Sequence, residues 1–261
     1  MAKNKRSARR ALEHLLELGW EVCAVVAPTS DPDAPAAQSV DRAAAEHGLR
    51  LVSDADLYAQ LGSEDRGLDL DGVDLVLSFL FWSRIRAPLI ELGRIGCLNF
   101  HPAPLPEMRG VGGYNVAILE RFTEWGVSAH FVDADFDTGD LVRVNRFPID
   151  PEAATAFTLD LESQERLLEN FRAVVDTAEA GEDLPRKPQG EGRYVTREEL
   201  ETLRRVPEGA TAEEVERRIR AFWYPPYPGA TVELGGRAFT LVDERTLADV
   251  AAQYRSAGLL P

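Results

Sequence analysis

Cysteine, histidine and methionine are scarce in this sequence, and long apolar runs are missing. The 261 residues include two cysteines, four histidines and two methionines. Cys23 and Cys97 both lie in apolar, strand-like runs, so buried free thiols in a reducing cytosol are a simpler account than a disulfide. No apolar run approaches the ~20 residues of a membrane helix, and the first residues lack the apolar core of a signal peptide. These absences predict a cytoplasmic protein without a membrane segment.

Positive charge is also in short supply. Lysine and arginine number 29 against 44 acidic residues, which gives a net charge of −15. A surface this acidic repels a phosphate backbone unless a basic patch is set aside, so nucleic acid is not the expected partner. No histidines and cysteines cluster at zinc spacing, and no nucleophilic serine or cysteine motif is present. We therefore expect neither a metal nor a covalent enzyme intermediate.

Apolar residues are plentiful, and the segments that contain them alternate along the chain between strand-like and helix-like patterns. Apolar content is 44% of the chain, which is ample for a core. We expect strands over 21–27, 49–52, 74–80, 97–100, 128–133 and 141–149, and helices over 7–18, 40–46, 54–61, 114–121 and 155–180. Strands that alternate with helices are typical of α/β proteins, in which helices cover both faces of a mostly parallel sheet.

A polar segment at 181–193, which contains glycine and proline, predicts a linker between two domains, 1–180 and 194–261. The second is expected to be a small α+β domain with helices over 196–203 and 211–222. Thr211 and Glu214 fit a capping box at the start of the latter helix. Gly235-Gly236 between 231–234 and 238–242 predicts a hairpin.

The segment from 97 to 140 carries the clearest chemistry. Asn99 and His101 share one parity at the end of a strand, so their side chains point the same way. Prolines at 102, 104 and 106 then end the strand and stiffen the loop. The next predicted strand ends in an acidic loop that contains Asp133 and Asp137. An amide donor, an imidazole and a carboxylate at two strand ends can together act on a carbonyl.

The same segment resembles the signature of the formyl-tetrahydrofolate-dependent formyltransferases, which include methionyl-tRNA and sugar N-formyltransferases. That signature is Asn-x-His-Pro-x-x-Leu-Pro-x-x-x-Gly, followed after the next strand by Asp-x-Gly. Its Asn, His and Asp fall on Asn99, His101 and Asp137. Pro104 departs from the pattern, since leucine or an equivalent is common there; it is expected to stiffen the loop without touching the chemistry.

The resemblance implies a Rossmann-like formyltransferase fold and a formyl donor, formyl-tetrahydrofolate, which passes its formyl group to a primary amine. Asn99 would stabilise the oxyanion, His101 would move a proton, and Asp137 would orient His101. Which group is the general base stays open. The expected donor-binding residues are Phe81, Trp82, Ser83, Ile85 and Asp133. The expected acceptor-binding residues are Pro102, Arg109, Gly110 and Tyr114.

Several alternatives stay open at this point. His130 shares a strand face with Ser128, and a buried, hydrogen-bonded histidine is favoured there over a catalytic one. Arg220 and Tyr224 are expected to pack the tail rather than to contact substrate. The sequence does not give the oligomeric state, although dimers are common among similar proteins.

The short tail and the acidic chain favour a nucleotide-linked amino sugar as the acceptor. Methionyl-tRNA and glycinamide ribonucleotide remain alternatives. So do two other classes of function, a formyl-tetrahydrofolate hydrolase and a folate-binding module without activity.

No strand precedes the first expected helix, although the resemblance implies one in the middle of the sheet. Its loss should expose two strand edges. We interpret residues 3–8 as the remnant of a strand-to-helix turn, which would place Met1 downstream of the natural start.

Overall fold

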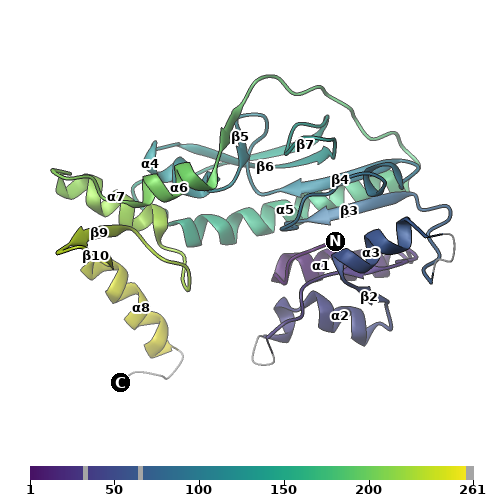
Figure 1. Cartoon of the computed structure of the whole chain (residues 1–261), viewed down its shortest axis with the longest axis horizontal. Coiled ribbons are helices and arrows are strands. Elements are labelled where there is room, and N and C mark those ends of the chain that lie inside the picture. Colours follow the sequence, from purple (N-terminus) through teal and green to yellow (C-terminus); the bar gives the residue numbers. More distant parts are fainter. Residues whose placement is uncertain (32–34, 64–66, 257–261) are drawn as a thin grey trace. The chain divides into compact units, whose positions relative to one another are not determined.

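The computed structural model describes residues 1–31, 35–63 and 67–256 (Figure 1). These residues form two compact units. The first unit combines Met1–Arg109, Gly126–Phe147 and Glu162–Arg193, and the second takes the intervening segments and the part that begins at Tyr194. Both units therefore draw on separate stretches of the chain. The division into domains 1–180 and 194–261 stays a prediction.

A four-stranded sheet carries the candidate site. Its strand order is β3-β4-β6-β7, with β3 at Leu75–Phe79, β4 at Gly96–His101, β6 at Glu124–Phe131 and β7 at Leu141–Pro148. Strands β3 and β4 are parallel, whereas β4 and β6 are antiparallel. The strand expected at 128–133 corresponds to β6, which begins earlier, at Glu124, and ends at Phe131. Phe131 pairs with Leu98 of β4.

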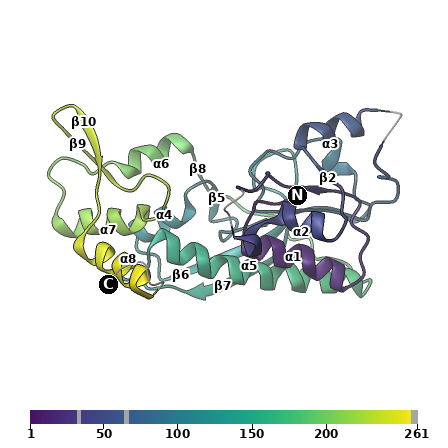
Figure 2. The same ribbon diagram turned by 90° about the horizontal axis from the view of Figure 1, so that it is seen from below.

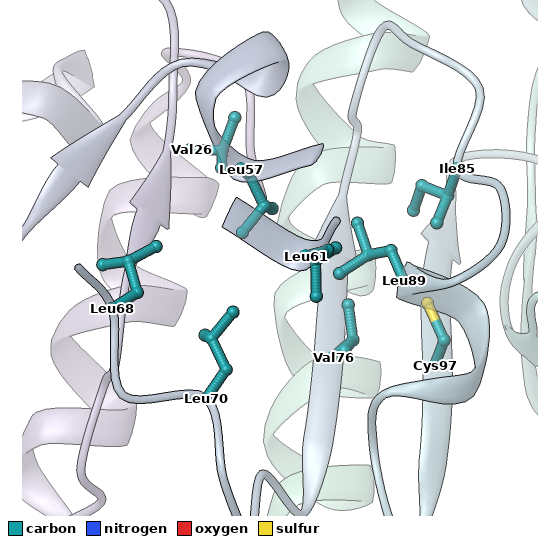
Figure 3. Close-up of a cluster of buried hydrophobic side chains, with 9 residues drawn as sticks. All are labelled: Val26, Leu57, Leu61, Leu68, Leu70, Val76, Ile85, Leu89 and Cys97. Atoms are coloured by element: carbon teal, nitrogen blue, oxygen red, sulfur yellow. The ribbon is translucent and has the colours of Figure 1, made fainter. Parts of the chain in front are cut away.

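Helices cover both faces of this sheet in the first unit, which confirms the predicted α/β class. On one face, the Phe171 ring of α5 (Ala156–Glu179) lies 5.7 Å from the Phe79 ring and 4.9 Å from the Phe100 ring. On the other face, α3 (Asp54–Leu61) contributes side chains to a buried apolar cluster with β3 and β4 (Figure 3). That cluster contains Val26, Leu57, Leu61, Leu68, Leu70, Val76, Ile85, Leu89 and Cys97.

Strand alternation decides which side chains meet which helix. Cys97 belongs to the cluster with α3, while Phe100 packs on α5. Because successive side chains in a strand point to opposite faces, Asn99 and His101 share the face of Cys97. The site residues of β4 therefore lie on the α3 face, at the carboxyl end of the strand.

A second, small parallel ladder joins β1 (Val25–Val26) to β2 (Leu51–Val52). The helices α1 (Arg6–Glu17) and α2 (Val40–Glu46) belong to the same unit, and α1 runs beside α5 (Figure 2). Arg10 of α1 forms an ion pair with Glu165 of α5. The strand expected over 21–27 is wrong in length, because the ladder to β2 forms only at Val25 and Val26.

The first residues of the chain lie between β1 and β3 and bond to both strands. The Ala2 amide donates to Val26 O at 2.9 Å, and Ala2 forms an isolated parallel bridge with Phe79. The amino group of Met1 donates to Leu77 O at 2.7 Å, and burial lowers its pKa to about 6. A cavity of about 590 Å³, lined by these residues and by α1, lies beside them. Within the described residues, only this bridge precedes α1, so the central strand implied by the resemblance is represented by a single paired residue.

The second unit is built around α4 (Gly113–Leu119) and α7 (Ala212–Phe222), and Asn115 donates to Ala221 O at 2.7 Å. The predicted capping box of Thr211 and Glu214 is confirmed. So is the hairpin, which comprises β9 (Thr231–Leu234) and β10 (Arg237–Thr240). A further helix, α8 (Glu244–Ser256), was not expected from the sequence.

The remaining elements are short. They are α6 (Arg197–Arg204), the two-stranded sheet of β5 (Met108–Gly110) and β8 (Arg193–Val195), and the 3₁₀ turns η1 (Ala36–Gln38) and η2 (Leu89–Glu91). None of the helices in the described ranges has the length and apolar character needed to cross a bilayer.

Candidate active site

Three polar side chains form one row across the sheet. Ser78 of β3 pairs with Asn99 of β4, and Asn99 pairs with His130 of β6. Residues paired in adjacent strands point to the same face, so the three side chains lie side by side. Ser78 Oγ donates to Asn99 Oδ1 at 2.8 Å, and Asn99 Nδ2 lies 3.1 Å from His130 Nε2. The strand register thus fixes an amide between a hydroxyl and an imidazole.

The row also determines which way the Asn99 amide faces. His130 Nδ1 lies 2.7 Å from Phe131 O, and a carbonyl only accepts, so Nδ1 carries the proton. In the neutral imidazole Nε2 then accepts a hydrogen bond from Asn99 Nδ2. One Asn99 N–H is occupied in this way, and among the described residues the second N–H remains for a ligand. Such a fixed N–H suits the stabilisation of an oxyanion.

His101 ends β4 and is held in one tautomer by the loop that follows it. Its Nε2 lies 3.2 Å from Met108 O, so Nε2 donates and Nδ1 is the free base position. Ser128 braces the same loop, because its Oγ donates to Ala103 O at 2.8 Å and accepts from the Leu105 amide at 2.9 Å. The proline-rich loop therefore fixes the ring rather than merely ending the strand.

Burial and charge act on His101 in opposite directions. The side chain is 9% exposed, and desolvation lowers its pKa below the usual value. The Asp137 carboxylate opposes this by raising the pKa, and Asp137 Oδ1 lies 3.6 Å from His101 Nδ1. The net direction is downward, so the neutral imidazole is favoured near neutral pH, as a general base requires.

Asp137 comes from a loop rather than from a strand. It follows β6 by several residues and has a φ of 58°, in the left-handed region that non-glycine residues rarely adopt. Its Oδ1 lies 3.6 Å from His101 Nδ1 and 3.7 Å from His130 Nε2. Gly139 follows closely, and a Cβ there would meet Phe131 O at 2.0 Å. The turn back onto β6 therefore requires glycine.

Asn99, His101 and Asp137 consequently lie together, and His130 joins them. Asn99 Nδ2 lies within hydrogen-bond distance of His130 Nε2, and Asp137 Oδ1 lies 3.7 Å from that nitrogen and 3.6 Å from His101 Nδ1. The arrangement offers a donor for a developing oxyanion, a neutral imidazole for a proton, and a carboxylate that stabilises the imidazolium. It suits attack of a nucleophile on a carbonyl carbon.

The expected donor-binding residues follow β3 but differ in exposure. The rings of Phe81 and Trp82 lie 4.3 Å apart, and Trp82 is 45% exposed, so it is accessible to a ligand. Ser83 Oγ donates to Asp54 Oδ2 at 3.0 Å. The Ile85 side chain is buried in the apolar cluster of Figure 3, which leaves its backbone for any ligand contact.

Asp133 shapes its own loop. Its Oδ1 accepts hydrogen bonds from Thr138 Oγ1 at 2.6 Å and from the Asp135 amide at 3.2 Å. A hydrogen bond from the Arg84 guanidinium to Ala134 O joins this loop to the one that carries Trp82. Asp133 is thus a structural neighbour of Asp137, and a direct part in binding the donor stays a prediction.

The expected acceptor-binding residues fall into both units. Pro102 follows His101 and is half-buried. Arg109 Nη2 donates to Gln189 Oε1 at 3.0 Å and to Gly190 O at 2.8 Å, so its guanidinium is engaged within the first unit. Gly110 and Tyr114 belong to the second unit, where the Tyr114 ring lies 5.7 Å from that of Trp125. Their part in binding an acceptor stays a prediction.

Sequence reasoning missed two neighbours of the site, Ser78 and Gln189, and the contacts of a third, His130. Ser78 is a lone polar residue in an apolar strand, a signal that the sequence does contain. His130 was expected to be buried and hydrogen-bonded, which it is, with 2% exposure, but its contacts with Asn99 and Asp137 depend on the strand register. Gln189 lies in the segment interpreted as a linker, and nothing in its sequence context marks it.

Comparisons with known proteins point to a single family. A family model described as "Formyl transferase" matches residues 3–169. A methionyl-tRNA formyltransferase from Methylibium petroleiphilum is 31% identical over 250 residues, which cover 90% of this chain and 76% of that protein. A GDP-perosamine N-formyltransferase from Brucella melitensis is 29% identical over 172 residues, which cover 64% of this chain and 63% of that protein.

Solved structures share the fold at low identity. An N-formyltransferase from Helicobacter canadensis, solved with folinic acid and dTDP-3-aminofucose, has a TM-score of 0.70 at 20% identity and covers 90% of this chain and 83% of its own. A 4-N formyltransferase from Francisella tularensis has a TM-score of 0.71 at 18% identity and covers 93% of this chain and 95% of its own. The first of these carries a folate derivative, the class of donor expected from the sequence.

Proposed function

Because this chain belongs to the formyl transferase family, we propose that it transfers a formyl group from formyl-tetrahydrofolate to the amino group of a nucleotide-linked amino sugar. The predicted family is confirmed, and so is the predicted enzyme class, a formyltransferase. The acceptor and the roles of individual residues belong to the proposal. The observation that carries it is the oriented Asn99 amide beside the contact of His101 with Asp137.

In the proposed reaction the neutral amine attacks the formyl carbon, and a new C–N bond forms. The carbonyl oxygen gains negative charge, which the second N–H of Asn99 stabilises. His101 Nδ1 accepts the proton that the amine loses, since Nε2 is engaged with Met108 O. The carboxylate of Asp137, 3.6 Å away, stabilises the resulting imidazolium. As the bond to the folate nitrogen breaks, the same proton passes to that nitrogen.

Net charge and similarity both support a small acceptor. A chain with a net charge of −15 repels a polyanion such as tRNA, whereas a nucleotide-linked sugar carries only a diphosphate. The relative from Brucella melitensis acts on GDP-perosamine by its name, and the neighbour from Helicobacter canadensis was solved with a dTDP-linked aminofucose. Both acceptors place a primary amine on a nucleotide-linked sugar.

Methionyl-tRNA is the second candidate acceptor. The observation in its favour is the 31% identity with a methionyl-tRNA formyltransferase, over 76% of that relative. If the acceptor were tRNA, its affinity for the protein would fall steeply as the salt concentration rises, because counterion release dominates such complexes. A rate that is nearly independent of salt would therefore favour the sugar acceptor.

An acceptor panel tests the proposal. The protein is incubated with formyl-tetrahydrofolate and, separately, with GDP-perosamine, dTDP-3-aminofucose, charged initiator tRNA, glycinamide ribonucleotide or buffer. Folate absorbance follows donor use, and mass spectrometry detects a product heavier by one formyl group. We expect product with a nucleotide-linked amino sugar. Product with tRNA alone, formate release in buffer, or no donor use with any amine would each refute the proposed acceptor.

A further inference from the structure

The segment interpreted as a linker is bound to the loops of the candidate site. Lys187 and Leu141 exchange backbone hydrogen bonds of 3.0 and 2.8 Å, next to the loop that contains Asp137. The Arg193 amide donates to Glu107 O at 3.3 Å, in the loop that follows His101. A Cβ at Gly192 would lie only 1.6 Å from Pro106 O, so this close approach requires glycine. The segment therefore lies directly against both loops.

Gln189 is the side chain in this segment that joins the loop of Asp137 to Arg109. Its Nε2 donates to Asp137 O at 3.1 Å and to Gly139 O at 2.6 Å. Its Oε1 accepts from Arg109 Nη2 at 3.0 Å. Carbonyls only accept and a guanidinium only donates, so the orientation of the amide is unambiguous. The side-chain amide thus uses both N–H groups on the loop of Asp137 and its oxygen on Arg109 of β5, the strand that follows the loop of His101.

The loop of Asp137 needs such support. A left-handed backbone is unfavourable for a residue that carries a side chain, and Asp137 adopts one. The hydrogen bond from Thr138 to Asp133 closes the start of the loop, and Gln189 holds its end on both sides of Thr138. The φ of Asp137 determines where its side chain leaves the backbone. Hydrogen bonds to the carbonyls of Asp137 and Gly139 hold this backbone conformation, and with it the direction in which the Asp137 side chain leaves the backbone.

We propose that Gln189 is a positioning residue that holds the Asp137 carboxylate against His101, with Arg109 of β5 as its anchor. The kinetic consequence depends on the proposed formyl transfer. The structural consequence, the distance from Asp137 to His101, does not. An experiment on the protein without substrates can therefore test the positioning separately from the reaction.

The experiment uses Gln189→Met, which removes all three hydrogen bonds without changing the charge or the length of the side chain much. Gln189→Asn keeps the amide but is too short to reach both the loop of Asp137 and Arg109, and it serves as the milder variant should Gln189→Met fail to fold. Gln60→Met is the matched control, because Gln60 Oε1 accepts from the Gly67 amide at 2.6 Å in a different loop. The chain has four histidines, so their NMR signals can be assigned with single variants.

The primary measurement is the pH titration of His101 in the free protein. The Asp137 charge raises the His101 pKa, so loosening Asp137 should lower that pKa further in Gln189→Met, and by less in Gln189→Asn. Gln60→Met should titrate like the wild type. If the protein transfers formyl groups, kcat of Gln189→Met should fall by up to ~100-fold, while the KM for the formyl donor changes little.

A wild-type His101 titration in both folded Gln189 variants would overturn the positioning role, even if stability or turnover fell. A lowered His101 pKa would support it, even if the wild type formylates no acceptor in the panel. In that second case the proposed function fails, and the inference about Gln189 stands.

Discussion

The polar row on the strands and the carboxylate on the loop are positioned by different means. Ser78, Asn99 and His130 occupy paired positions in β3, β4 and β6, so the backbone ladder places all three. Asp137 has no such pairing and depends on hydrogen bonds to its loop, among them those from Gln189, which lies far along the chain. The amide of the site is therefore built into the sheet, whereas the carboxylate is held by side chains.

This difference has a consequence for how the site responds to change. A ladder is cooperative, and removing one hydrogen bond from a side chain in the row leaves the backbone register intact. A loop in a left-handed conformation has fewer constraints, and each one removed gives the carboxylate more freedom. We therefore expect substitutions around the carboxylate to alter chemistry more than comparable substitutions around the amide. His101, which both regions contact, should be the most sensitive position.

His101→Ala should produce the largest effect. It removes the only imidazole whose Nδ1 faces Asp137 in the described part of the chain, and acid–base groups contribute ~100-fold or more to rate. Single-turnover formyl transfer measures the loss, and fluorescence titration with the folate donor measures binding. We expect a rate loss above ~100-fold with binding retained. Near-normal turnover would show that His101 does not move the proton.

Asp137→Asn should come next and should also change the pH profile. The substitution keeps the shape but removes the charge that raises the His101 pKa, so that pKa falls further below its usual value. In the proposed reaction the neutral imidazole accepts the proton, so the ascending limb of the kcat profile should move to lower pH. We expect a rate loss of about 10- to 100-fold at neutral pH.

Stopped-flow rates across the acidic range check this prediction for Asp137→Asn. Asp135→Asn is the matched control, since Asp135 lies in the same loop and its amide, rather than its carboxylate, bonds to Asp133. A limb that moves to higher pH in Asp137→Asn would contradict the electrostatic role. An equal shift in Asp135→Asn would show that the effect arises from charge in general rather than from the position of Asp137.

The fold could be predicted from the sequence wherever a pattern is local. Helices α2 and α3 begin and end where the sequence predicted, and the capping box of α7 is confirmed. Strand β1 was predicted too long because an apolar run becomes a strand only where a partner is available, and β2 offers just Leu51 and Val52. The position of Ala2 between Val26 and Phe79 likewise depends on distant partners.

The same limit applies to the site. Asn99 and His101 could be placed on one face because strand parity is local, and the order of the motif predicted that Asp137 would join them. The contact of His130 with Asn99 could be predicted only from the register of β4 against β6, which pairs the two residues. Gln189 could not be found at all, since its contacts join segments that are distant in sequence. The polar composition of 181–193, together with its glycines and prolines, indicated a linker there.

Ser78→Ala should have the smallest effect, and it tests the claim that the ladder holds the amide. Ser78 Oγ donates to Asn99 Oδ1, and the Asn99 amide keeps its other contact with His130 after the hydroxyl is removed. Losing one buried hydrogen bond should cost about 1 kcal/mol of unfolding free energy and less than ~10-fold in rate. Urea denaturation and formyl-transfer rates measure the two quantities.

Ser163→Ala is the control for this substitution. Ser163 is buried in α5, and its hydroxyl has no hydrogen-bond partner among the described residues, so its removal should leave stability unchanged or slightly higher. The comparison isolates the hydrogen bond to Asn99 from the general effect of removing a buried hydroxyl. If Ser78→Ala slowed formyl transfer as much as Asp137→Asn, the amide would depend on side chains as the carboxylate does. The contrast between the two halves of the site would then be wrong.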